Sequence, residues 1–105
     1  MGLYRLALSQ RVFSSAGIVK WWCQQNHDGL PQKAGMPQVA MNEIHGSWWD
    51  PSNPVVKMSG NLRSDLFDNL LEWEQSCDMC LTVGTSLSGM NADRLAESCG
   101  KRAVK

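Results

Sequence analysis

The chain has 105 residues, 43% of them apolar, and its ten basic and ten acidic residues give a formal net charge of zero. This length allows one domain with a thin core, because a domain of about 100 residues buries only about 60–65% of its unfolded surface. The charges are balanced and scattered, so we expect no direct nucleic-acid partner and no membrane partner. No apolar run approaches the ~20 residues that span a bilayer.

The N-terminal segment, residues 1–16, allows two interpretations. It contains basic residues and serines, and the chain has no acidic residue before Asp28. That composition is typical of a mitochondrial presequence, whereas Leu3, Leu6 and Ala7 recur at the spacing of a helix. We favour a short helix of the domain and keep a targeting segment or a misjudged gene boundary as alternatives.

The four cysteines are Cys23, Cys77, Cys80 and Cys99. They fall in apolar or helical segments of a chain without a secretory signal, so we expect reduced thiols in an intracellular protein, either cytoplasmic or nuclear. The mitochondrion stays open as an alternative. Cys77 and Cys80 have CxxC spacing, but a zinc site needs four ligands and there is no second pair. We therefore place this pair at a helix end and a buried strand, with a redox dithiol as the alternative.

The first half of the chain alternates apolar runs with turn-forming residues. Ile18–Cys23 is compact and apolar, which predicts a buried strand, and Val39–Ile44 is a candidate short strand. Between them, Asn26–Gly35 is rich in turn formers and predicts a loop with one helical turn. Prolines make His45–Pro54 a long loop, after which Val55–Met58 is a candidate edge strand.

The second half has clearer periodicity. Ser64–Ser76 begins with a capping serine and carries apolar residues at helical spacing, so we predict a helix. Met79–Val83 predicts a strand, Asn91–Ser98 a helix closed by Gly100, and Arg102–Val104 the start of a further strand. This order of elements predicts an α/β protein, a partial Rossmann-like parallel sheet with flanking helices that is incomplete at both ends.

Ligands of open α/β sheets lie beyond the carboxyl ends of the strands, where this sequence has two polar clusters. One is Gln25–Asp28 and the other is Gly84–Ser86, whose glycine allows close approach of the backbone to a ligand. The second cluster begins a stretch with P-loop glycine spacing, but Met90 and Asn91 replace the lysine and hydroxyl residue that an ATPase needs. His45 follows a candidate strand, where an imidazole can act as a general base.

Four blocks of sequence in this order carry a family resemblance. They are Gln24-Gln25-Asn26-His27-Asp28-Gly29-Leu30, Lys33-Ala34-Gly35, Glu43-Ile44-His45-Gly46 and Cys80-Leu81-Thr82-Val83-Gly84-Thr85-Ser86-Leu87. Together they resemble the sirtuins, which are NAD-dependent protein deacylases. The resemblance covers about residues 17–104, so the whole chain is interpreted as a partial sirtuin-type catalytic domain.

The resemblance implies an enzyme that consumes NAD as a co-substrate and transfers the acyl group of an acyl-lysine protein or peptide to ADP-ribose. By position, His45 would be the base that activates a ribose hydroxyl. The resemblance also implies the residues that line the cofactor site: Gln25, Asn26 and Asp28 at the nicotinamide and ribose, and Gly84, Thr85 and Ser86 at the adenosine side. From the residues themselves, the loop tryptophans Trp48 and Trp49 are the candidates for substrate contact.

The chain also departs from the family pattern. Sirtuins commonly hold a structural zinc with two cysteine pairs after the histidine-glycine pair, and residues 46–76 contain no cysteine, so we expect neither zinc nor another metal. Pro31 stands where many members have histidine, which suggests a divergent branch. No glycine-rich phosphate loop precedes Gly17, so we expect weak or no activity from these residues alone. The alternative is a non-catalytic interaction or regulatory remnant of the fold.

Overall fold

The structure is a computed structural model that describes residues 17, 19–57, 59–87, 89 and 92–103. The helix predicted within residues 1–16 lies outside the described residues. The chain forms two compact units, residues 1–63 and residues 64–105.

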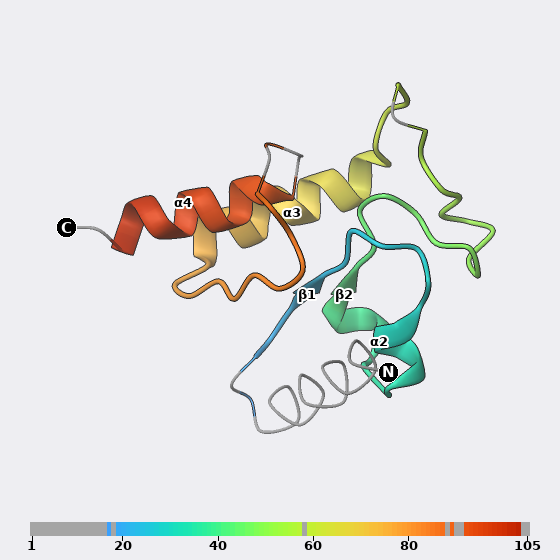
Figure 1. The fold of residues 1–105 in the computed structure, drawn as a ribbon, viewed down its shortest axis with the longest axis horizontal. Coiled ribbons are helices and arrows are strands. Elements are labelled where there is room, and N and C mark those ends of the chain that lie inside the picture. Colours follow the sequence, from blue (N-terminus) through green and yellow to red (C-terminus); the bar gives the residue numbers. More distant parts are fainter. Residues whose placement is uncertain (1–16, 18, 58, 88, 90–91, 104–105) are drawn as a thin grey trace. The chain divides into compact units, whose positions relative to one another are not determined.

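The first unit contains a parallel sheet of two very short strands, β1 (Trp22–Cys23) and β2 (Met41–Asn42) (Figure 1). Trp22 pairs with Met41 and Cys23 with Asn42, and the Gln24 amide extends the ladder by donating to the Asn42 carbonyl at 2.8 Å. The parallel pairing and the partial α/β class are therefore as the sequence predicts.

Both strands are shorter than predicted. The strand predicted over Ile18–Cys23 is reduced to its last two residues, and its tryptophan Trp21 is 42% exposed. The strand predicted over Val39–Ile44 is reduced to Met41–Asn42, because the preceding residues turn into a short 3-10 helix, η1 (Gln38–Ala40). A strand needs a neighbour along its whole length to satisfy its backbone groups, and here each strand meets its partner over only two residues.

The crossover between the strands contains the single helical turn that the sequence predicts for Asn26–Gly35. This helix is α2 (Leu30–Lys33), which has Pro31 in its first turn, where a missing N–H costs nothing. Gly29 precedes it with a φ of 67° in the left-handed region, which glycine adopts without strain. The core beneath this crossover is formed by Pro31, Ala34, Met36, Met41 and Ile44.

The edge strand predicted over Val55–Met58 is wrong for residues 55–57, and Met58 lies outside the described residues. Val56 donates one backbone hydrogen bond to the His45 carbonyl at 3.0 Å. A single bond of this kind does not build a ladder, so residues 55–57 have irregular backbone and are not part of a sheet. It nevertheless places the backbone after the proline loop directly beside the histidine.

The second unit contains two helices in contact, α3 (Ser64–Ser76) and α4 (Asp93–Ala103). The prediction of a helix over Ser64–Ser76 is confirmed at both ends. The apolar residues that are buried here are Leu70, Trp73, Ala92, Leu95 and Cys99. Leu70 and Trp73 in α3 are three residues apart and Leu95 and Cys99 in α4 are four apart, which are the spacings of an apolar stripe that faces a partner.

Helix α4 runs further than the predicted Asn91–Ser98. It passes through Gly100 and ends at Ala103, so both the predicted stop at this glycine and the predicted strand at Arg102 and Ala103 are wrong. A Cβ at Gly100 would meet nothing within 4 Å outside the helix backbone, which shows that the glycine lies on an open face. Lys101 and Arg102 in the last turn favour continuation, because cations stabilise the negative end of the helix dipole.

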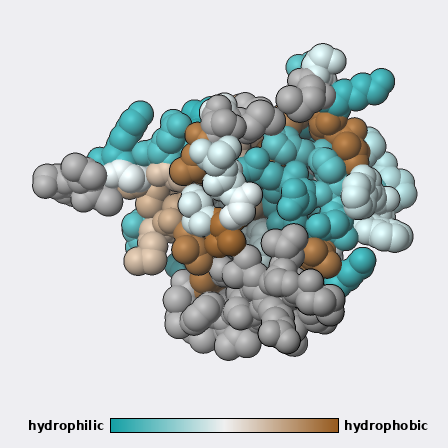
Figure 2. All heavy atoms as spheres, viewed as in Figure 1, coloured by the Kyte–Doolittle hydropathy of each residue, from teal (hydrophilic) through white to brown (hydrophobic). Residues whose placement is uncertain are grey.

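The strand predicted over Met79–Val83 is wrong. These residues form neither strand nor helix, and Met79, Leu81 and Val83 are 84%, 69% and 49% exposed. Apolar residues that reach the surface appear as brown spheres in Figure 2. High strand propensity means that a side chain fits well on a pleated, half-buried sheet surface. Among the described residues no strand pairs with residues 79–83, so this propensity does not produce a strand here.

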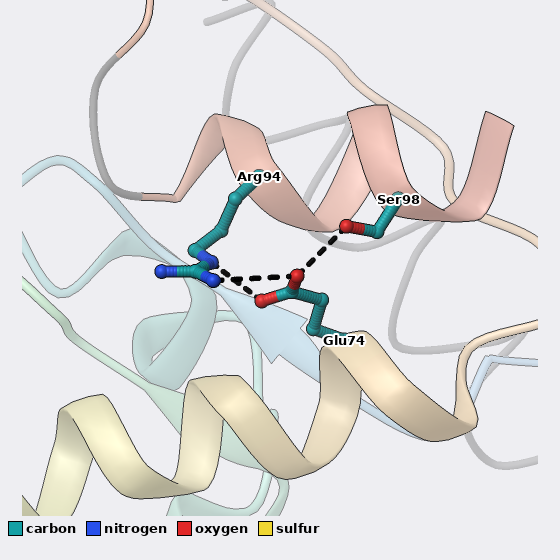
Figure 3. A network of polar contacts seen from close by, with 3 residues as sticks. All are labelled: Glu74, Arg94 and Ser98. Atoms are coloured by element: carbon teal, nitrogen blue, oxygen red, sulfur yellow. Dashed lines mark hydrogen bonds and ion pairs between the residues drawn. The ribbon is translucent and has the colours of Figure 1, made fainter. Parts of the chain in front are cut away.

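A polar network joins the two helices of the second unit (Figure 3). The Glu74 carboxylate on α3 accepts hydrogen bonds from the Arg94 guanidinium and, at 2.8 Å, from the Ser98 hydroxyl on α4. Arg94 also lies over the Phe67 ring, 5.8 Å from its centroid. The hydrogen bonds from Arg94 and then from Ser98 lower the pKa of Glu74, because they stabilise its charged form.

We predict that Glu74→Gln destabilises the α3–α4 unit by about 0.5–1 kcal/mol at pH 7, a modest value because solvent screens the half-exposed Arg94. Since folding lowers the pKa of Glu74, its contribution exists above the unfolded pKa and is lost as pH falls through the folded one. The difference from wild type should therefore begin to shrink as the pH falls below about 4.3 and continue to shrink at lower pH. Urea denaturation from pH 7 to pH 3 measures it.

The matched control is Glu72→Gln on the same helix, because Glu72 is exposed and takes no part in the Glu74 network, so its loss of stability at pH 7 should be smaller. An equal loss of stability for Glu74→Gln at pH 7 and pH 3 would contradict the ionic interpretation of the network.

Candidate functional site

Two loops leave the same end of the parallel strand pair in the first unit and are fastened to each other. We call them the β1 loop (residues 24–29) and the β2 loop (residues 43–50). The Trp48 amide donates to the His27 carbonyl at 3.1 Å, and the Trp49 indole donates to the Asp28 carbonyl at 3.2 Å. Parallel pairing places both loops at one edge of the sheet, and these bonds hold them together there.

His45 lies at the junction of the two loops. Its Nδ1 is 3.4 Å from the Gln25 carbonyl oxygen, and because a carbonyl only accepts, this contact requires the proton to be on Nδ1. The other ring nitrogen, Nε2, is buried and has no hydrogen-bond partner among the described residues. A neutral imidazole in this tautomer presents the Nε2 lone pair as a proton acceptor.

Gly46 allows the β2 loop to turn immediately after the histidine. Its φ is 91°, and a Cβ built there would lie 2.2 Å from the Pro54 carbonyl oxygen and 2.7 Å from the Val55 Cα. Both neighbours are backbone atoms, which cannot rotate away as a flexible side chain can. The close passage of residues 54–56 behind the histidine therefore requires glycine at this position.

We predict that Gly46→Ala destabilises the first unit by roughly 2–4 kcal/mol, from the strain of a positive φ together with the backbone overlap. Gly84→Ala is the control, since Gly84 has a similar φ of 71° but open space around its Cβ position. That variant should lose only about 1 kcal/mol. Chemical denaturation of both variants gives the comparison, and equal losses would show that the overlap at Gly46 is relieved at no cost.

Gln25, Asn26 and Asp28, which the resemblance places at the nicotinamide and ribose, have three different environments in the structure. Gln25 is half-buried and presents its carbonyl to His45, whereas Asn26 is exposed. The Asp28 carboxylate accepts hydrogen bonds from the Leu30 amide at 3.1 Å and from the Gln24 side chain at 3.4 Å. Asp28 therefore also has a local structural role, closing the turn that leads into α2, and its sequence context does not indicate this role.

His27 and the two loop tryptophans form a second contact between the loops. The His27 Nδ1 donates to the Gly46 carbonyl at 3.0 Å, and its ring lies 6.0 Å from the Trp48 ring at a tilt of 48°. Trp48 and Trp49 are 68% and 69% exposed, so most of each indole remains available for a ligand. The sequence offers no signal for the His27 contact, because its acceptor is a backbone carbonyl 19 residues away.

The second predicted polar cluster, Gly84–Ser86, belongs to the second unit. All three residues are exposed and lie in irregular backbone rather than after a strand. The Thr85 hydroxyl accepts a hydrogen bond from the Leu87 amide at 3.2 Å, and Leu87 has a φ of 53°. The structure thus brings His45 together with Gln25, and convergence of Gly84–Ser86 on the same site stays a prediction.

The cysteines of the second unit are free thiols, and Cys77, Cys80 and Cys99 lie close enough to affect one another's pKa. Burial is the main cause that raises the pKa of Cys77 to about 11, and the adjacent thiols of Cys99 and Cys80 add to the increase. Burial likewise raises the pKa of Cys80. The CxxC pair does follow the end of α3 as predicted, but Cys80 is half-buried in irregular backbone. A raised pKa disfavours the nucleophilic thiolate that a redox dithiol needs.

We predict that Cys77 reacts with iodoacetamide at pH 8 roughly one hundred times more slowly than the cysteine of an unstructured peptide, because so little of it is thiolate. Cys99→Ser should accelerate the reaction, since it removes a neighbouring thiol that raises the pKa of Cys77. Mass spectrometry of the alkylated peptides gives the rates. Labelling of Cys77 at the rate of the unstructured peptide would contradict the raised pKa.

Among the described residues, no group of three or more histidine, cysteine or acidic side chains is arranged to hold a metal ion. Within the same part of the chain, none of the helices combines the length and apolar character needed to cross a membrane. Comparisons with protein-family models, with curated proteins and with solved structures found no match to this chain.

Proposed function

We propose that the chain is part of a sirtuin-type, NAD-dependent protein-lysine deacylase, with His45 as its catalytic base. The observation that carries the proposal is the buried Nε2 of this histidine, which no described residue satisfies, on a ring whose Nδ1 is held by the Gln25 carbonyl. A buried polar atom without a partner is uncommon in folded proteins, and a ligand group is one way to satisfy it.

The residues of the β1 loop fit the co-substrate. A carboxamide such as that of nicotinamide offers both donors and acceptors, which amide side chains like those of Gln25 and Asn26 can match. The chemistry that bound NAD would supply is an electrophilic ribose carbon. The role of His45 is to accept a proton at Nε2 from a hydroxyl, while the bond at Nδ1 fixes the tautomer that can do so.

The loop tryptophans fit the other substrate. Trp48 and Trp49 present broad apolar faces at the surface of the β2 loop, which also carries His45, and the long methylene chain of an acyl-lysine is apolar along its length. Hydrogen bonds hold the Trp48 backbone and the Trp49 indole to the β1 loop, so both are fixed relative to His45. We therefore assign substrate contact to these two residues and base chemistry to His45.

A non-catalytic interaction or regulatory role is the second candidate. The exposed and irregular backbone of residues 79–86 favours it, because this segment does not form the strand that would present Gly84–Ser86 to a cofactor. In that case the loops of the first unit would retain a binding surface without supporting turnover.

The test is nicotinamide release from NAD in the presence of an acetyl-lysine peptide. His45→Asn keeps a side-chain donor for the Gln25 carbonyl but removes the proton acceptor, so it should fold and lose at least ~100-fold in rate, as expected for a general base. His27→Ala is the control: it loses the Gly46 contact and should keep release in whatever fraction remains folded. Release that is unchanged in His45→Asn would refute the base, and no release from wild type would favour the second candidate.

A further inference from the structure

The first unit contains a cavity of about 370 Å³ whose lining does not include His45. It is lined by Gly29, Gln32, Lys33, Gln38, Glu43, Ser47, Trp49 and Asp50. The volume falls within the range of about 300–1,000 Å³ typical of small-molecule sites. All of these residues come from the crossover between the strands or from the β2 loop, so the cavity belongs wholly to the first unit.

Two residues that line the cavity have buried acceptor oxygens with no hydrogen-bond partner among the described residues: Gln32 Oε1 and Glu43 Oε2. Glu43 is only 3% exposed, and its other oxygen accepts a long hydrogen bond of 3.4 Å from Gln38. Leaving a buried charged acceptor unsatisfied is costly. Neighbouring atoms shield both oxygens, so a ligand in the cavity satisfies them only if the Gln32 and Glu43 side chains turn toward it, and it must then bring at least two N–H or O–H donors.

The charged residues in the lining and the Trp49 ring restrict the class of ligand further. Glu43 and Asp50 contribute two carboxylates and Lys33 one cation, so the lining carries an excess negative charge. The Lys33 ammonium lies 5.3 Å from the centroid of the Trp49 ring, which shows that a cation already occupies this indole face. Lys33 is exposed and its long side chain is flexible, so a better cation can displace it.

We propose that this cavity binds a guanidinium group. A guanidinium is a planar cation with five N–H donors, so it can satisfy Gln32 and Glu43 together while its face stacks on Trp49. An alkylammonium has the charge without the planar fork, and a urea has the planar donors without the charge. The inference does not depend on NAD chemistry or on His45. The group can belong to a free small molecule or to an arginine side chain of a peptide.

The experiment is a titration of the ¹⁵N-labelled chain, without NAD or acyl-lysine, followed at the Trp49 indole N–H resonance. The probes are ethylguanidinium, its neutral isostere ethylurea, n-butylammonium and a blocked Gly-Arg-Gly peptide. We expect saturable shifts with ethylguanidinium and at least ~10-fold weaker binding of ethylurea and butylammonium. Binding of both ethylguanidinium and the peptide marks the guanidinium alone as the recognised group, whereas binding of the peptide only marks an arginine side chain as its source.

Variants of the lining residues test the contacts that we propose for the guanidinium. Glu43→Gln should weaken ethylguanidinium binding at least ~10-fold, and Lys33→Gln should tighten it about 3-fold by removing the competing cation. Trp49→Ala, followed at the Ser47 amide, should weaken binding about 5-fold, whereas its matched neighbour Trp48→Ala should not. Lys33 is exposed, so its variant tests the proposal even if Glu43→Gln does not fold.

The proposal is overturned if ethylurea or butylammonium binds as tightly as ethylguanidinium, if Lys33→Gln weakens binding, or if neither ethylguanidinium nor the peptide shifts the resonance. None of these results bears on nicotinamide release. Failure of this inference and failure of the proposed function are therefore distinguishable.

Discussion

The parallel pairing of β1 with β2 is the constraint on which the first unit depends. Two strands of two residues each form too short a ladder to be stable alone. The two strands place the β1 loop and the β2 loop at the same edge of the sheet. Hydrogen bonds between these loops add to the few that join the strands. Backbone carbonyls at Gln25, His27 and Asp28 accept from the β2 loop, so the loops hold the strands as much as the strands place the loops.

The sequence predicts those parts of the fold whose signals are local. Helix α3 is confirmed from Ser64 to Ser76 because its cap and its apolar spacing lie within the same 13 residues. The strands are predicted in order and direction but not in length, and Met79–Val83 is wrong, because a strand exists only where a partner satisfies its backbone. Gly100 fails as a stop signal because Lys101 and Arg102 in the last turn favour continuation of the helix past a residue of low propensity.

The candidate site also has a part that the sequence predicts and a part that it does not. The proximity of His45 to the β1 loop follows from parallel strand order, which the residue pattern indicates. The structural roles of His27 and Asp28 do not, because they depend on where particular carbonyl and amide groups lie after the loops have closed. The unpartnered oxygens of Gln32 and Glu43 have no sequence signature at all, since satisfaction of a polar atom is a property of its neighbours in space.

Burial of Ile44 offsets part of the cost of the unsatisfied polar atoms in this thin core, two of which belong to its sequence neighbours Glu43 and His45. Ile44 is fully buried, and burying a side chain of this size stabilises the fold by about 1.5–3 kcal/mol. Each unsatisfied buried polar group costs about 1–3 kcal/mol, so the gain at Ile44 offsets roughly one of them. The hydrogen bonds between the loops offset part of the remaining cost. Gly46 avoids a further cost, because it lets the chain turn without displacing the residues behind it. A ligand that donates to Glu43 or His45 removes a cost that the folded chain already carries, so binding at either residue also stabilises the junction of the two loops.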